Sequence, residues 1–173
     1  MVKSVNFDDY QKTQTSYKDT NFLQSAEMAK LQLSRNHIGE VEALVFERDG
    51  LIVGQTIIVY RRSFRIFRKA LLLHGPLLDY NSITDLPDLL EALILYLKKK
   101  NIASLSIHPY LTNLIRNEEL EILKEDKADE VSKVFEKLGF EQYLDPEQAL
   151  VVNQMFVKPI DTFTTSDEML EAF

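Results

Sequence analysis

Hydrophobic positions along this 173-residue chain change their spacing several times, and each change predicts a new element. Two β-rich runs, residues 41–47 and 51–61, flank Asp49 and Gly50. This predicts a hairpin, because both turn residues tolerate positive φ. The second run is almost wholly apolar as far as Tyr60, so we expect an interior strand that is covered on both faces. Gly54 within it indicates a bulge or the close approach of another backbone.

The clearest helical pattern runs over residues 86–100. Its leucines recur at a spacing of 3.6 residues and predict one buried stripe: Leu86, Leu89, Leu90, Leu93 and Leu97. We expect Asp85 or Thr84 to cap the helix, with Pro87 in the first turn, where a missing N–H costs nothing. The helix ends in three lysines at residues 98–100, where positive charge is favourable.

Other patterns predict the remaining elements. Strands are expected at residues 2–5, 65–73, 102–107, 140–144 and 150–158. Helices are expected at residues 8–17, at 25–35 with Ser25 as its cap, at 129–138 before Gly139, and from Thr165 or Ser166 onward. The charged segment 117–127 is expected to be exposed.

Strands and helices are mixed without strict βαβ alternation, which predicts a mixed α/β (α+β) fold with a central mixed sheet and helices on both faces. The length suits one domain over residues 1–173. The last helix reaches Phe173 without a terminating signal, so we expect the chain to be a fragment of something longer.

Composition narrows the class of protein. The absence of cysteine excludes a disulfide framework, a thiolate metal site and a cysteine nucleophile. The formal net charge of -7 argues against nucleic-acid binding through bulk charge, although a local basic patch stays compatible with it. No apolar run approaches the roughly 20 residues that span a bilayer, and the N-terminus is not a secretory signal. We therefore expect a cytoplasmic protein.

Basic residues cluster in one segment of this acidic chain: Arg61, Arg62, Arg65, Arg68 and Lys69. Guanidinium groups can hold a phosphate through paired hydrogen bonds, whereas the alternative is a solvated hairpin tip. Both interpretations remain open from the sequence.

Three histidines offer acid–base chemistry, but they lie far apart in the sequence and predict no metal site. His37 lies in a polar turn, and His74 precedes a Gly-Pro pair at a strand end, where it can line a cleft. His108 ends a strand just before Pro109, which forces a turn. Side chains at such strand ends often face a ligand crevice, although a packed corner histidine is the alternative.

Several familiar catalytic patterns are missing. There is no nucleophile elbow and no P-loop. The five glycines are scattered at positions 39, 50, 54, 75 and 139, so no glycine-rich loop is available to bind the pyrophosphate of acetyl-CoA. We expect no cofactor.

Five segments, taken in order, resemble the FemABX family. Residues 22–29 (FLQSAEMA) resemble its "F-x-Q-S/T…W-A-x-x-K" motif, and residues 49–54 (DGLIVG) resemble its "DG-x-I-V-G/A" hairpin. Residues 75–80 (GPLLDY), 107–110 (IHPY) and 135–140 (FEKLGF) resemble "GP-V/L-V/L/I-DY", "I-D-P-Y" and the "L-G-F" that follows. Each motif is short, and the ordered set is what makes the resemblance specific.

The resemblance implies a fold and a function. Family members have two acetyltransferase-like (GNAT-like) lobes with a substrate cleft between them, and this chain is similar to the first lobe. They transfer an amino acid from aminoacyl-tRNA to the peptide stem of a peptidoglycan precursor, as in bridge synthesis in Gram-positive cell walls. The implied partners are therefore aminoacyl-tRNA and a lipid-linked or nucleotide-linked muropeptide, close to the membrane surface, with no acetyl-CoA.

The resemblance also implies site residues. The expected substrate-binding residues are Lys30, Gln32, Asp79, Tyr80, Tyr110, Arg61 and Arg65. His108 is the candidate that takes a proton from the acceptor amine. Three positions depart from the family pattern, since Met28 replaces a tryptophan, Gln32 replaces a phosphate-binding lysine and His108 replaces an aspartate. These departures favour one alternative, a non-catalytic binding domain of the same fold. A second alternative, an acyl-CoA-dependent N-acyltransferase, also stays open, although the missing pyrophosphate loop argues against it.

Overall fold

The structure is a computed structural model that describes residues 1–14, 21–35, 40–63, 67–112, 114–117, 119, 121–125 and 127–142. The chain divides into two units, Met1–Gln142 and Tyr143–Phe173, and all described residues belong to the first. The strand expected at 150–158, the helix expected after Thr165, and two single residues, His37 and Arg65, lie outside the described residues.

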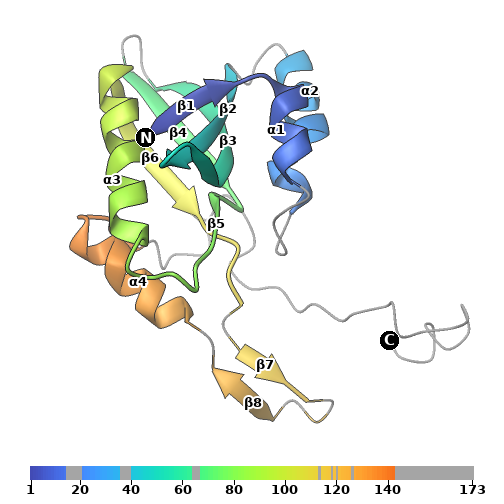
Figure 1. Cartoon of the computed structure of the whole chain (residues 1–173), viewed down its shortest axis with the longest axis vertical. Coiled ribbons are helices and arrows are strands. Elements are labelled where there is room, and N and C mark those ends of the chain that lie inside the picture. The colour runs from blue at the N-terminus through green and yellow to red at the C-terminus, as the bar shows by residue number, and fades with distance from the viewer. Residues whose placement is uncertain are drawn as a thin grey trace, which may run out of the picture. The chain divides into compact units, whose positions relative to one another are not determined.

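A mixed sheet forms the centre of the described unit (Figure 1). Its strands run in the order β1-β2-β3-β4-β6, and the short β5 also pairs with β3. The strands β4 and β6 are parallel and the other pairs are antiparallel. The bounds are β1 Val2–Val5, β2 Val41–Arg48, β3 Leu51–Ser63, β4 Phe67–Leu73, β5 Leu77–Leu78 and β6 Ile102–His108.

Helices cover both faces of this sheet, as expected (Figure 1). On one face lie α3 (Leu86–Lys99) and α4 (Ala128–Lys137), and on the other lie α1 (Phe7–Gln14) and α2 (Ala26–Ser34). A 3₁₀ turn, η1 (Phe22–Gln24), precedes α2. The mixed α/β prediction is confirmed.

Alternation along the strands supplies a core to each helical layer. The predicted leucine stripe of α3 is buried against the larger core, which includes Leu44, Phe46 and Ile58. Full burial of each leucine contributes about 1.5–3 kcal/mol. Positions one residue away, Ala43 and Ile57, face the smaller core of α1 and α2.

The predicted hairpin is confirmed in its turn and in its irregularity. Asp49 and Gly50 have φ of 51° and 79°. The β2–β3 register shifts opposite Gly54, where a Cβ atom would lie 2.2 Å from the Leu78 side chain, so β5 approaches too closely for any side chain here. The expected burial of the whole run is wrong at its start, because Leu51 follows directly on the solvent-facing turn and is 70% exposed.

The start of α3 corrects a prediction. Asp85 occupies the N-cap position but makes no side-chain capping bond. Its carboxylate instead forms an ion pair with Arg48 at 2.7 Å and accepts a hydrogen bond from the Ser82 hydroxyl at 3.0 Å. A tertiary partner has therefore replaced the local one. By contrast, Ser25 does cap α2, since its hydroxyl oxygen accepts from the Met28 N–H at 3.1 Å.

Two further differences concern the last described segments. Part of segment 117–127, which was expected only to be charged and exposed, forms the strand β8 (Ile122–Glu125), which pairs with β7 (Leu114–Arg116) just before the segment. The described part of the strand expected at 140–144 is not a strand. Phe140 instead completes the end of α4, because its N–H donates to the Phe135 carbonyl and the two rings pack edge to face. Gly139 ends that helix with φ of 83°, as predicted.

No helix in the described part of the chain has the length and apolar character needed to cross a membrane.

Candidate functional site

The carboxyl ends of the two parallel strands bring two distant histidines to one corner of the sheet. Leu73 of β4 lies opposite His108 of β6, so His74 follows directly beside it. The Gly75 N–H donates to the His108 carbonyl at 3.1 Å and fixes the chain as it leaves β4. Crevices at the carboxyl ends of parallel strands are common ligand sites. We call His74, His108 and Tyr110 the histidine corner.

A buried glutamine supports this corner from the α2 side. On this side, β3 pairs with β5 at residues 54–55 and with β4 from residue 59 onward. Residues 56–58 of β3 therefore have no partner among the described strands on this side, which leaves an opening in the sheet. The Gln24 side chain is 1% exposed and fills this opening. Its Oε1 accepts from the Ile57 N–H at 2.8 Å, and its Nε2 donates to the Leu73 carbonyl at 2.7 Å. The amide thus replaces the missing backbone partners.

Gln24 also explains Gly75. A Cβ atom at position 75 would lie 2.7 Å from the Gln24 side chain, which its hydrogen bonds hold in place. Only glycine lets the chain pass here. The first and third segments of the family resemblance therefore meet in space at the base of the histidine corner.

His74 is held in an unusual state. Its φ of 53° lies in the left-handed region, and its ring stacks on Tyr110 with centroids 5.3 Å apart. Its Nδ1 is buried and has no hydrogen-bond partner among the described residues. Burial lowers the pKa of His74 below its ordinary value of 6.5. The imidazole is therefore neutral at pH 7.

His108 shares this environment. Burial lowers its pKa, and the neighbouring His74 lowers it further, because two positive charges at one corner repel each other. His108 is half-buried at the last position of β6. A neutral imidazole at such a place can accept a proton at physiological pH.

A small polar pocket adjoins the histidine corner. It has a volume of about 110 Å³ and is lined by residues after β5, after β6 and at the start of α4, including Asp79, Tyr80 and Tyr110. Asp79 accepts from the Asn81 N–H at 3.0 Å, which orients its carboxylate. The Tyr80 hydroxyl donates to the Pro76 carbonyl at 2.8 Å, and burial raises the pKa of Tyr80, so this hydroxyl stays protonated. Three of the expected substrate residues thus lie together.

The other expected substrate residues lie elsewhere. Lys30 on α2 forms an exposed ion pair with Asp8 at 2.9 Å. Gln32 is only 9% exposed, and its Oε1 has no partner among the described residues. Arg61 lies at the amino end of β4, opposite Lys69. At about 3.3 Å per residue, the five residues from Lys69 to His74 separate Arg61 from the histidine corner by about 17 Å.

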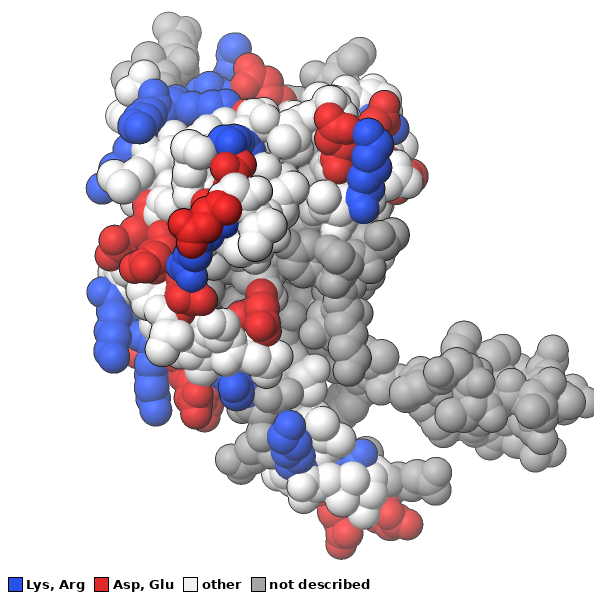
Figure 2. Space-filling view, in the orientation of Figure 1, with Lys and Arg blue, Asp and Glu red and all other residues white. Residues whose placement is uncertain are grey.

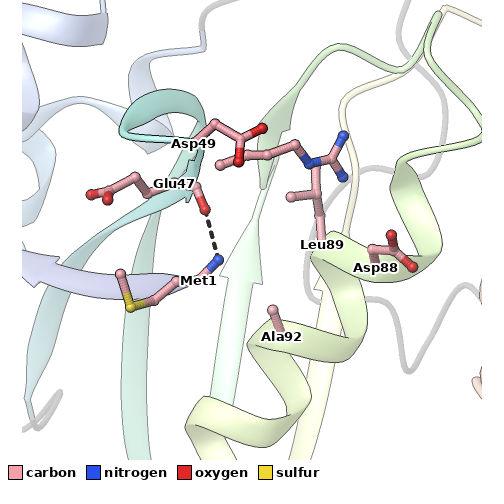
Figure 3. A pocket seen from close by; sticks show the side chains of 7 residues that line it. Met1, Glu47, Asp49, Asp88, Leu89 and Ala92 are labelled. Carbon is pink, nitrogen blue, oxygen red and sulfur yellow. Dashed lines mark hydrogen bonds between the residues drawn. The ribbon is translucent and has the colours of Figure 1, made fainter.

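A second, larger pocket of about 360 Å³ lies between the β2–β3 turn and α3 (Figure 3). Three carboxylates line it, from Glu47, Asp49 and Asp88, together with the Arg48 guanidinium. The amino-terminal nitrogen of Met1 also lines it and donates to the Glu47 carbonyl at 2.7 Å. None of the expected site residues lines it. Three carboxylates outnumber the two cations, so the lining does not favour a phosphate-bearing substrate.

Sequence reasoning missed two parts of the site. His74 was expected only to line a cleft, and its unpaired Nδ1 could not be foreseen, because no periodicity reports on a hydrogen bond that is absent. Gln24 was noted only as a motif letter. A glutamine beside the cap of a helix normally faces solvent, and its burial depends on the opening between β3 and β5.

Comparisons with known proteins place the fold. The crystal structure of FemX matches with a TM-score of 0.61 and 15% identity, over 82% of this chain and 32% of FemX. A probable acetyltransferase (TM-score 0.52, 12% identity) and the glucosamine-6-phosphate N-acetyltransferase of Arabidopsis thaliana (0.50, 11%) each match over 91% of this chain and 99% and 98% of their own. These likenesses show an acetyltransferase-type fold.

This chain therefore spans about a third of the length of FemX. A comparison with curated protein sequences finds no match. The FemAB family model matches residues 2–170, which is nearly the whole chain. The chain belongs to the FemAB family.

Proposed function

We propose that this chain is the N-terminal, GNAT-like lobe of an aminoacyltransferase that moves an amino acid from aminoacyl-tRNA to the peptide stem of a peptidoglycan precursor. The observation that carries this proposal is the FemAB family match over residues 2–170. Because the chain spans about a third of FemX, we assign the reaction to the complete natural protein. We place that reaction in the cytoplasm, where charged tRNA is found.

The proposed reaction needs a proton acceptor. It needs no covalent enzyme intermediate, because the aminoacyl ester is already activated. The amine of the stem attacks the ester carbonyl carbon of the aminoacyl-tRNA, and the bond from that carbon to the ribose oxygen breaks. A lysine-type amine has a pKa near 10.4, so keeping it neutral at pH 7 costs about 4.6 kcal/mol. The neutral imidazole of His108 takes the amine proton and returns one to the leaving ribose hydroxyl.

The adjoining pocket supports the second requirement, which is positioning. In this pocket Asp79 offers an oriented carboxylate, and Tyr110 of the histidine corner offers an aromatic ring. Such groups suit a short peptide that carries amides and an amine. Holding amine and ester in reacting geometry can contribute about 7–11 kcal/mol.

One observation favours a second candidate, a non-catalytic binding domain of the same fold. The family's phosphate-binding lysine is replaced by the buried Gln32, and the nearby Lys30 is paired with Asp8. No described cation on α2 is therefore left to hold a precursor phosphate. An acyl-CoA-dependent transferase is the third candidate, because the structural matches include acetyltransferases, although the scattered glycines argue against it.

The test combines the complete natural protein with aminoacyl-tRNA and nucleotide-linked precursor. We expect amino acid transfer that requires charged tRNA, with uncharged tRNA as the control. Precursor binding without transfer from any charged tRNA would contradict the proposal and favour the binding domain. Binding of acetyl-CoA, with acetyl transfer, would favour the third candidate.

A further inference from the structure

Five cations gather at the end of the sheet that lies opposite the histidine corner. They come from the β3–β4 hairpin and from the last turn of α3: Arg61, Arg62, Lys69, Lys98 and Lys99. We call this group the basic end. All five are exposed, and none forms an ion pair within the part of the chain that the structure describes. Figure 2 shows lysine and arginine side chains gathered at the upper left, where α3 ends in Figure 1.

The hairpin and the helix end form one surface. Arg68 and Lys100 both lie over the ring of Tyr60, at 5.0 and 5.8 Å from its centroid. These two cations are neutralised, because Arg68 pairs with Glu40 and Lys100 pairs with Glu42. They connect β4 to α3 and leave the five outer cations facing solvent.

The pairing of β3 with β4 places cations opposite one another, which lowers the stability of the hairpin. Arg61 lies directly opposite Lys69, and Arg62 lies directly opposite Arg68. Like charges in such cross-strand pairs are destabilising. A chain with a net charge of -7 nevertheless concentrates its cations here, so its field is strongly asymmetric.

Two large apolar side chains are exposed among these cations. Phe67, at the start of β4, is 52% exposed, and Leu95 on α3 is 57% exposed. Leu95 shares a helix face with Lys98 and Lys99, since these residues are three and four positions further along. An exposed leucine contributes nothing to the binding of phosphate groups. The headgroup region of a lipid bilayer, by contrast, accommodates apolar side chains that are flanked by cations.

We propose that the basic end docks on a membrane surface that contains anionic lipid. The cations lie against the headgroups, and Phe67 and Leu95 enter the region between headgroups and acyl chains. The histidine corner is then held about 20 Å from the surface, along the length of β4. This inference goes beyond the proposed function, and its test involves no transfer reaction, so either can fail without the other.

The test measures flotation of the complete natural protein with vesicles of phosphatidylcholine alone and with 30% phosphatidylglycerol added, at low and high salt. We expect binding only with the anionic lipid, weakened by salt. In the variant Arg62→Gln/Lys69→Gln/Lys98→Gln we expect binding to fall at least about tenfold, since each cation near such a surface contributes about fivefold. The matched control is Lys124→Gln/Lys133→Gln/Lys137→Gln, which removes equal charge from exposed positions elsewhere and should stay within about twofold.

Three results would overturn the proposal: no binding to anionic vesicles at low salt, equal losses in the two triple variants, or unchanged vesicle binding with loss of RNA binding in the basic-end variant. The last result would identify nucleic acid as the partner. Circular dichroism checks that the variants fold. The second variant, Phe67→Ser/Leu95→Ser, keeps all charges and should also weaken flotation, whereas unchanged flotation would exclude insertion of these side chains.

Discussion

The two ends of the β4 strand differ in how completely their polar groups are satisfied. Near the basic end, the Glu42 carboxylate accepts hydrogen bonds from the hydroxyls of Tyr60 at 2.5 Å and Tyr96 at 2.7 Å, and from the Lys100 ammonium at 2.7 Å. At the histidine corner, the His74 Nδ1 is buried without a partner in the described structure, and His74 has a positive φ. The buried carboxylate near the basic end has all the hydrogen bonds it needs, whereas a buried nitrogen at the histidine corner lacks one among the described residues.

We propose that the end with the unsatisfied groups is the end that does chemistry. Unsatisfied groups and strained backbone cost free energy, and they persist where the surrounding structure enforces them. Gln24 provides that enforcement at the histidine corner, because it restores the ladder where β4 leaves β3. The Glu42 network fixes the end of α3 to the sheet, so it serves the fold.

The largest expected effect is on the chemistry of the histidine corner. His108→Ala should lower turnover in the transfer assay by about 100-fold to 10,000-fold, because the proton acceptor is lost. His108→Asp should retain much more activity, since a carboxylate can also take the proton and the family has aspartate here. Equal turnover in wild type and His108→Ala would exclude His108 as the base.

Removing the support of the corner should be the largest effect on stability. Gln24→Ala leaves the Ile57 N–H and the Leu73 carbonyl unpaired and opens a cavity, so we expect a loss of about 3–4 kcal/mol in the free energy of unfolding. Urea unfolding measures it. The control Gln11→Ala removes an exposed glutamine from α1 and should cost less than about 0.5 kcal/mol. If Gln24→Ala lowered the free energy of unfolding only slightly, the opening between β3, β4 and β5 would not need the Gln24 side chain to fill it.

Removing the Glu42 carboxylate should lower the free energy of unfolding by less than Gln24→Ala does, and the loss should depend on pH. Burial alone would raise the pKa of Glu42, but hydrogen bonds from Lys100, Tyr60 and Tyr96 outweigh it and hold the pKa below 4.5. The stability from this shift is therefore fully present above pH 4.5 and is lost as the pH falls through the lower folded pKa. We expect Glu42→Gln to cost about 2 kcal/mol near neutral pH.

The measurement for this end is urea unfolding of Glu42→Gln and wild type from pH 7 to pH 3. The difference between the two should shrink toward acid. Glu91→Gln, at an exposed position on α3, is the control and should show a change below about 0.5 kcal/mol at every pH. A difference that does not vary with pH would contradict the role given to the charge.

The smallest expected effect is a titration shift within the corner. His74→Asn removes a group whose positive charge disfavours protonation of His108, so the pKa of His108 should rise toward its ordinary value while staying lowered by burial. NMR titration of the His108 ring measures this. An unchanged pKa would show that the two imidazoles do not interact, and a falling pKa would contradict the repulsion between them.

The sequence predicted elements whose signals are local. The leucine stripe of α3, the Asp49-Gly50 turn and the Ser25 cap were all found as expected, since a few neighbouring residues determine them. Prediction failed where a distant partner decides. The Asp85 carboxylate pairs with Arg48 in place of the helix cap, and β8 lies in the charged segment 117–127, where the sequence pattern predicted no strand.

The site was predictable only in part, for the same reason. The motif order led to Asp79, Tyr80, Tyr110 and His108, which the structure places at or beside one pocket. Arg61 was expected to bind substrate with these residues, yet on β3 it lies opposite Lys69, toward the end of β4 that is far from the pocket. Which end of a strand a residue occupies follows from sheet topology, and the parallel pairing of β4 with β6 was not visible in the pattern.

The most direct test of this account is hydrogen exchange of the complete natural protein with and without nucleotide-linked precursor. We predict slower exchange over residues 74–80 and 107–112, which contain the histidine corner and its pocket, and unchanged exchange over residues 67–71 at the other end of β4. Protection confined to the basic end or to α2, with the histidine corner unchanged, would contradict it.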